Sequence, residues 1–279
     1  MSEKRHRPRD VEEHGFFPTA RGIRCKLSLV APPGIVTQAV VVRLVDYGEA
    51  DRIATLLTGD AGKVSALARG ARRSQKRFGS LSLFALGEAT LRRGRGELWG
   101  LDQFSATRDF PHIACDVTRM AHAAYVCELG RELVPLEAHD AETFALVAAA
   151  LGEIDRAGYG AADLRRFELQ LLGAVGLAPS LDRCVGCGAA PDDTRELTFD
   201  ARRGGVLCPS CDQGRGRALP AAVWRALLQA QQGEPMPPLT PAEMAVARDL
   251  LQAVLGEHLG KPLRSLEFIL KLNAAGSPG

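Results

Sequence analysis

The pattern in this chain with the most specific chemistry is a pair of Cys-x-x-Cys motifs. Cys184 and Cys187 form the first motif and Cys208 and Cys211 form the second, with twenty residues between them. Two such turns can bring four thiolates to one tetrahedral centre, which is the ligand set of a structural zinc ion. A thiol–disulfide redox pair and a degenerate metal site remain open as alternatives.

Four sulfur ligands would fill every tetrahedral position and leave none for water, so we expect one structural zinc ion per chain and no catalytic metal. Gly186 and Gly188 would let the first turn fold tightly, with backbone N–H groups directed at the sulfurs. The chain has seven cysteines, an odd number that suits a reducing cytoplasm better than a disulfide scaffold. Cys25 has no evident partner, and Cys115 and Cys127 are expected to be core thiols.

A second pattern is a run of basic residues that follows a predicted strand. Residues 62–100 contain nine basic and two acidic residues, whereas residues 111–180 contain five basic and ten acidic residues, in a chain whose net charge is only +2. Clustered cations repel one another unless an anion lies between them, and a nucleic-acid backbone is the usual anion. The candidate DNA-binding residues are therefore Lys63, Arg69, Arg72, Arg73, Lys76, Arg77, Arg92, Arg93 and Arg95.

Two less specific interpretations of this basic region stay open. A charge run is often only a solvated loop that keeps a protein soluble. Phe78, Trp99 and Phe104 could stack on bases, or they could fill the core of a small barrel.

The elements that must position these residues change in character near Pro111. Before it, β-branched and alternating segments predict five strands, at residues 35–45, 52–58, 63–68, 81–91 and 98–107. Five short strands suggest a small barrel, either an OB-fold or an SH3-like barrel. After it, helical periodicity covers residues 117–129, 144–154, 164–175, 220–228, 240–255 and 263–272. Residues 196–199 and 205–207 predict a hairpin between the cysteine pairs.

Enzyme motifs are absent from the sequence or incomplete. The segment from Gly59 to Val64 lacks the spacing and the Ser or Thr of a phosphate-binding P-loop, and Gly94, Gly96 and Gly100 miss the dinucleotide fingerprint by one residue. The chain contains no Gly-x-Ser-x-Gly and no His-Glu-x-x-His. No apolar run approaches membrane-spanning length. We expect neither an enzyme nor a membrane protein.

A family resemblance is carried by the segments Tyr47-Gly-Glu-Ala-Asp51, Leu57-Thr58, Gly62-Lys63, Ala68-Arg-Gly-Ala-Arg-Arg73 and Phe78. Together they resemble the N-terminal domain of the RecO family of bacterial DNA repair proteins. The cysteine pairs within helical sequence and Leu259-Gly-Lys-Pro-Leu-Arg-Ser265 extend the resemblance over about residues 35–272. The N-terminal extension of about thirty residues departs from the family pattern.

The resemblance implies an α+β multidomain protein: a five-stranded OB-fold barrel, then an α-helical domain interrupted by a zinc module with four cysteine ligands. The expected division is a disordered extension at 1–34 (or an over-early translation start), the OB-fold DNA-binding domain at 35–110, the first part of the helical domain at 111–180, the zinc-binding module at 181–217, and the second helical part with the tail at 218–279.

The family also implies a function. Its members are non-enzymatic cytoplasmic recombination mediators that bind single- and double-stranded DNA and anneal complementary strands. They work with RecR and single-strand-binding protein to load RecA. The alternative for this chain is a protein adaptor whose basic face binds an acidic peptide tail without annealing DNA.

Overall fold

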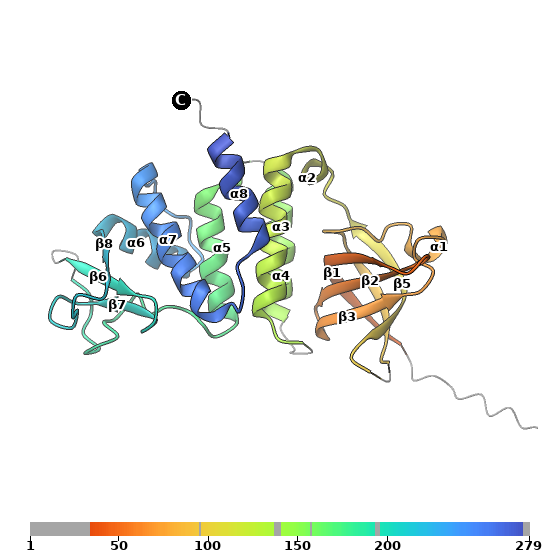
Figure 1. Ribbon diagram of the computed structural model, residues 1–279, viewed down its shortest axis with the longest axis horizontal. Coiled ribbons are helices and arrows are strands. Elements are labelled where there is room, and N and C mark those ends of the chain that lie inside the picture. The colour runs from red at the N-terminus through yellow and green to blue at the C-terminus, as the bar shows by residue number, and fades with distance from the viewer. Residues whose placement is uncertain (1–33, 95, 137–140, 157, 193–195, 276–279) are drawn as a thin grey trace, which may run out of the picture. The chain divides into compact units, whose positions relative to one another are not determined.

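A closed barrel of five strands forms the N-terminal part of the computed structural model (Figure 1). The structure describes residues 34–94, 96–136, 141–156, 158–192 and 196–275, which belong to the unit that begins at Pro33. The strands are β1 (Ile35–Tyr47), β2 (Asp51–Thr58), β3 (Gly62–Ala68), β4 (Leu86–Arg92) and β5 (Trp99–Arg108), and their order around the barrel is β1-β2-β3-β5-β4.

The strand order decides between the two barrels that the sequence left open. Strands β3 and β5 pair in parallel, and the other neighbours pair antiparallel. The short helix α1 (Gln75–Phe78) lies between β3 and β4. A five-stranded Greek-key barrel of this kind is the OB-fold, so that expectation is confirmed.

The middle of strand β1 is buried on both of its faces, which explains the apolar run from Ala39 to Val42. Ala39 and Val41 point into the barrel core, whereas Val40 and Val42 belong to the core that the helices form. All four are at most 3% exposed. A register shift between Val41 and Arg43 marks a bulge, after which Val45 and Tyr47 are exposed.

The segment between β3 and β4 differs from the prediction in two ways. The fourth strand begins at Leu86 and not at Leu81, because Phe84 has a φ of 71°, which an extended strand does not accommodate. The basic segment is not a plain loop, since α1 forms within it. Phe78 and Leu81 are buried in the barrel core, and this burial anchors the helix.

In the part of the chain that the structure describes, seven helices follow the barrel: α2 (Pro111–Cys115), α3 (Val117–Leu133), α4 (Ala141–Arg156), α5 (Ala161–Ala174), α6 (Ala221–Gln231), α7 (Pro241–His258) and α8 (Arg264–Ala275). The Asp116 side chain caps α3, and the predicted box of Thr240 and Glu243 caps α7. In α3 the expected apolar face is only partly right. Val117 and Met120 are exposed, whereas Tyr125 and Val126 are fully buried.

The cysteine motifs lie within a small three-stranded sheet. Strands β6 (Leu197–Asp200) and β7 (Gly205–Leu207) form the expected hairpin. The third strand, β8 (Arg217–Leu219), was not expected, because three residues carry too little pattern to identify a strand.

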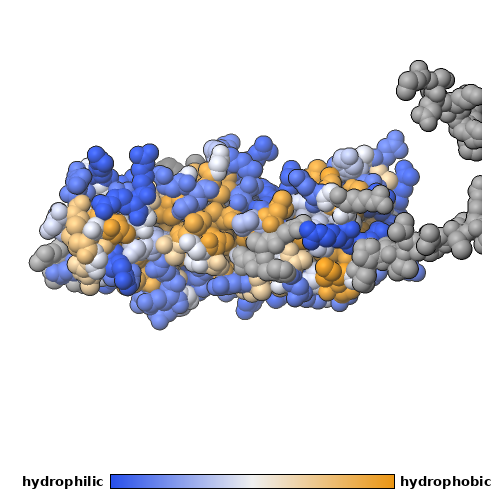
Figure 2. Space-filling view, turned by 90° about the horizontal axis from the view of Figure 1, so that it is seen from below, coloured by the Kyte–Doolittle hydropathy of each residue, from blue (hydrophilic) through white to orange (hydrophobic). Residues whose placement is uncertain are grey.

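Helix α3 meets the barrel closely at Gly130. A β-carbon at this position would lie 3.1 Å from Leu57 Cδ1 of β2 and 3.0 Å from Val147 Cγ2 of α4. None of the described helices is both long enough and apolar enough to span a bilayer. On the face drawn in Figure 2, apolar residues reach the surface in patches among hydrophilic ones.

Candidate nucleic-acid surface and metal centre

The basic segment after β3 is fastened to the turn between β1 and β2. Gly70, which has a φ of 69°, donates its backbone N–H to Asp51 Oδ1 at 2.8 Å. The backbone N–H of Arg72 donates to the carbonyl oxygen of Ala50 at 3.0 Å. These bonds hold residues 69–77, called here the basic loop, beside residues 48–50.

Within the basic loop the cationic side chains are exposed and weakly held. Arg77 Nη2 donates to the carbonyl oxygen of Arg69 at 2.9 Å. Arg72 Nε lies 3.8 Å from an Asp46 carboxylate oxygen, and Arg73 Nη2 lies 3.9 Å from one of Glu49. Such exposed ion pairs contribute about 0–1 kcal/mol each, so a phosphate can replace these carboxylates at small cost.

The hairpin between β4 and β5 carries the remaining predicted cations. Arg92 Nη2 pairs with Asp102 Oδ1 at 2.9 Å, and the Arg93 guanidinium carbon lies 5.3 Å from the Trp99 ring centroid. Arg95 lies outside the described residues. Arg92 is opposite Gly100 of β5, and Gly100 is opposite Leu67 of β3. At about 4.8 Å per strand, Arg92 is therefore about 10 Å from Leu67. Arg69 follows Leu67 by two residues, directly after the end of β3.

Lys63 lies apart from the other candidates. It is at the start of β3, whereas the basic loop follows the end of this strand. The six residue steps from Lys63 to Arg69 correspond to about 20 Å of extended chain. The Lys63 ammonium donates to the main-chain carbonyl of Arg131 in α3.

The three aromatic residues named as possible stacking partners are in the barrel core. Phe78, Trp99 and Phe104 are 3%, 5% and 2% exposed, so the alternative that they fill the barrel is confirmed. Tyr47 is 56% exposed at the end of β1, and Arg43 is exposed on the same strand. Neither was among the candidate residues from the sequence, although their spacing of four places them on one side of a strand.

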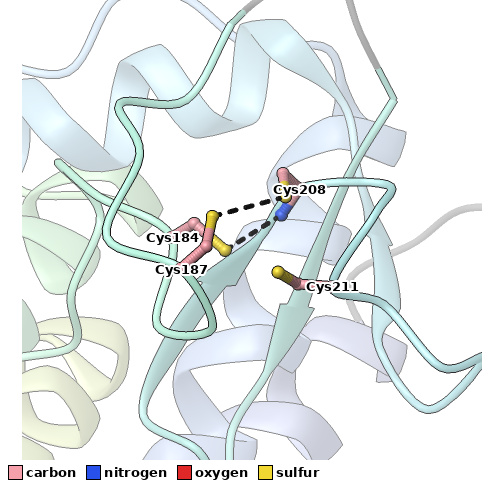
Figure 3. A group of neighbouring side chains, drawn as sticks. All are labelled: Cys184, Cys187, Cys208 and Cys211. Atoms are coloured by element: carbon pink, nitrogen blue, oxygen red, sulfur yellow. Dashed lines mark hydrogen bonds between the residues drawn. The ribbon is translucent and has the colours of Figure 1, made fainter.

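The four thiols of the two Cys-x-x-Cys motifs converge on one point (Figure 3). Their sulfur atoms all lie within 4.8 Å of one another, and Cys187 Sγ is 3.8 Å from Cys208 Sγ. The first pair precedes β6 and the second follows β7, so the hairpin brings them together. The cluster can hold a metal ion. Of the other two described cysteines, Cys127 is buried as expected, but Cys115 is exposed, so its placement in the core was wrong.

Glycine and backbone amides shape this cluster as the sequence predicted. A β-carbon at Gly186 would lie 2.7 Å from Cys211 Cβ, and Gly188 has a φ of 75°. The backbone N–H groups of Gly186 and Cys208 donate to Cys184 Sγ at 3.3 and 3.4 Å.

Two thiols of the cluster have shifted pKa values of opposite sign. Burial raises the pKa of Cys184, but hydrogen bonds from the backbone N–H groups of Cys208, Cys187 and Gly186 outweigh it and lower this pKa to about 6. Hydrogen bonds with the Cys208 and Cys187 thiols raise the pKa of Cys211 to about 12. At neutral pH the cluster therefore contains one ready thiolate and one thiol that must lose a proton to bind a metal.

Comparison with known proteins matches both parts of the chain. The family described as "Recombination protein O N terminal" matches residues 34–110, and "Recombination protein O C terminal" matches residues 115–267. The chain belongs to the RecO family. The resemblance carried by Tyr47-Gly-Glu-Ala-Asp51 and the segments after it is thereby confirmed.

Relatives of the RecO family align along most of the chain. "DNA repair protein RecO" of Anaeromyxobacter dehalogenans (strain 2CP-C) is 46% identical over 239 residues, which are 82% of this chain and 93% of that protein. The proteins of the same name from Myxococcus xanthus (strain DK1622) and Geobacter sulfurreducens (strain ATCC 51573 / DSM 12127 / PCA) are 37% and 38% identical. These alignments each cover 84% of this chain, and 96% and 97% of the two relatives.

Proposed function

We propose that this RecO family member is a non-enzymatic recombination mediator in DNA repair. It binds single- and double-stranded DNA, anneals complementary strands, and works in the cytoplasm with RecR and single-strand-binding protein to help load RecA. Membership of the family over both the barrel and the helical region supports this function. The observation that carries it is the exposed basic loop beside the β1–β2 turn, whose cations pair only loosely with carboxylates.

The DNA contacts belong to the basic loop and the following hairpin. These residues are Arg69, Arg72, Arg73, Lys76, Arg77, Arg92 and Arg93, together with Arg95 outside the described residues. Lys63 takes no part in this contact, because its ammonium donates to a main-chain carbonyl of α3. Contacts of cations with phosphates are independent of sequence, and they lower the repulsion between two strands on one surface. Base pairing then supplies the sequence discrimination that annealing requires.

The ion that fits the cysteine cluster is zinc, held by Cys184, Cys187, Cys208 and Cys211 as one structural ion per chain. A zinc–sulfur bond of about 2.3 Å gives tetrahedral sulfur–sulfur edges of about 3.8 Å. Cys187 Sγ and Cys208 Sγ are 3.8 Å apart, which agrees with that edge, and all four sulfurs lie within 4.8 Å of one another. Four thiolates leave no open position, so the ion would stabilise the β6–β7–β8 sheet and take no part in catalysis.

The test compares two variants of equal net charge. One replaces Arg72, Arg73, Lys76 and Arg77 by Ala, and the control replaces the exposed Arg202, Arg215, Arg217 and Lys271 by Ala. If about five phosphates are neutralised, the affinity of the wild type for single strands falls roughly a hundredfold between 50 and 200 mM salt. We expect the loop variant to lose annealing and most of this salt dependence, and the control to keep both.

Equal losses in both variants would show that net charge alone drives binding, which contradicts a defined DNA surface. Unchanged annealing by the loop variant, with measurable RecR association, would leave the adaptor role, in which the basic face binds an acidic peptide tail. Nucleotide turnover by the pure protein would contradict a non-enzymatic mediator.

A further inference from the structure

An exposed tyrosine stands at the edge of an apolar strip on the outside of the barrel. Tyr47 is 56% exposed and Val45, two residues before it, is 42% exposed. Exposed large apolar side chains are costly without a partner when they are contiguous. The aromatic rings of Phe78, Trp99 and Phe104 are buried in the barrel, so these three cannot serve this surface.

The strand register extends the strip across four strands. Val45 is opposite Ile53 of β2, Ile53 is opposite Leu67 of β3, and Leu67 is opposite Gly100 of β5. Their sequence neighbours Leu44, Ala54, Ala66 and Leu101 pack in the barrel core, so alternation directs the strip outward. Three strand spacings make the strip about 14 Å long. We call Val45, Tyr47, Ile53, Leu67 and Gly100 the outer strip.

Cations flank the outer strip on several sides. Arg43 lies two residues before Val45 on β1, and Arg69 directly follows the end of β3, two residues after Leu67. Arg92, opposite Gly100, stands at the far end. Three of the nearby carboxylates already accept hydrogen bonds: Asp46 from Arg52, Asp51 from the Gly70 N–H, and Asp102 from Arg92. Glu49 on the β1–β2 turn is exposed and lies 3.9 Å from Arg73. An apolar strip with positive edges is complementary to a polymer that has flat apolar faces and a negative backbone.

We propose that Tyr47 is a stacking platform for an unpaired base, and that the outer strip binds single-stranded DNA with its phosphates directed toward Arg43, Arg69 and Arg92. This inference rests on the proposed function and specifies the form of DNA that this face selects. Base faces are accessible in a single strand and hidden in a duplex, so stacking adds affinity for the single strand only. Pairing of two strands removes the bases from Tyr47, and the annealed product then holds only the phosphate contacts.

The experiment compares Tyr47→Ala and Tyr47→Phe with the wild type, and uses Phe268→Ala as a matched control. Phe268 is 43% exposed on α8 and is also a solvent-facing aromatic residue. The probes are a single-stranded oligonucleotide that contains 2-aminopurine and the corresponding duplex, at fixed salt. We expect Tyr47→Ala to weaken single-strand binding roughly 5- to 150-fold and to reduce 2-aminopurine quenching. Duplex affinity should change less than about twofold, and Tyr47→Phe and Phe268→Ala should bind like the wild type.

Three results would overturn the inference: wild-type single-strand affinity in Tyr47→Ala, an equal loss for single strand and duplex, or competition by an acidic peptide without any 2-aminopurine signal. The failure of the proposed function looks different, because the wild type would then bind neither form of DNA. If the wild type binds DNA in a salt-dependent way and Tyr47→Ala binds equally well, only the stacking role of Tyr47 is rejected and the proposed function stands.

Discussion

The Lys63 ammonium donates a hydrogen bond to the main-chain carbonyl of Arg131, and this contact joins the start of β3 to the last turn of α3. Carbonyl groups in the last turn of a helix lack partners within the helix, and a cation there also interacts favourably with the helix dipole. Burial lowers the pKa of Lys63, although the nearby Glu132 carboxylate acts in the opposite direction. A cation that looks like a DNA ligand in the sequence thus supports the junction between barrel and helices.

Lys63→Met tests this role. Because the pKa of Lys63 is lowered in the folded protein, the folded state loses this proton at a lower pH than the unfolded chain does. The free energy of unfolding of the wild type, relative to that of Lys63→Met, should not change with pH below the lowered pKa. It should increase with pH between that pKa and 10.5, the ordinary pKa of lysine. Urea unfolding of both proteins at several pH values measures the difference. A fall in that difference, or a Lys63→Met variant with a reduced salt dependence of DNA binding, would contradict the assignment.

Gly130 is a second point at which the barrel and the helices touch. A larger side chain there must displace Leu57 or Val147, which lie 3.1 and 3.0 Å from the position of a β-carbon. We expect Gly130→Leu to lower the free energy of unfolding by about 1–3 kcal/mol through overpacking. Gly173→Ala in α5 is the control, because nothing lies within 4 Å of its β-carbon position. It should leave stability unchanged or raise it by up to about 1 kcal/mol, as measured in urea. Equal effects of the two substitutions would refute the close contact.

Glu128 of α3 holds the start of α8. Its Oε2 atom accepts from the backbone N–H and the hydroxyl of Ser265, at 2.9 and 2.5 Å, and both residues are 8% exposed. Glu128→Ala leaves these buried donors without an acceptor and removes a negative charge from a helix N-terminus, so we expect a loss of about 2–3 kcal/mol in urea unfolding. Glu267→Ala, an exposed change in the first turn of α8, should cost under about 1 kcal/mol. A Glu128→Ala protein as stable as this control would argue against a stabilising role for the hydrogen bonds between Ser265 and Glu128.

The pKa values of Cys184 and Cys211 predict that zinc binding releases protons. At pH 7 the Cys211 thiol, with a pKa of about 12, must release its proton to ligate zinc, whereas Cys184, with a pKa of about 6, is already mostly thiolate. Zinc added to chelator-treated protein in weak buffer should therefore release protons, and more of them at pH 5 than at pH 7, because Cys184 is then protonated as well. An indicator dye measures the release.

Cys187→Ala should lose bound zinc and increase hydrogen exchange in β6–β8, and the exposed Cys115→Ala should keep its zinc. Zinc retained at one ion per chain in Cys187→Ala would reject the four-thiolate site.

Local patterns in the sequence determined the family, the barrel followed by helices, and the four-cysteine site. The thiols of residues 184–211 are paired within short turns, so their spacing alone implies convergence, and the capping box of Thr240 and Glu243 marks the start of α7 in the same local way. Only the tertiary structure decided which cations share a surface. Lys63 lies near the start of β3 and Arg69 directly follows its end, but Lys63 contacts α3 whereas Arg69 is exposed. The tertiary structure also decided that Trp99 is in the core and Tyr47 is at the surface. The exposure of an aromatic residue depends on the register of the barrel strands and on what packs against each face, and the spacing of residues along the chain encodes neither.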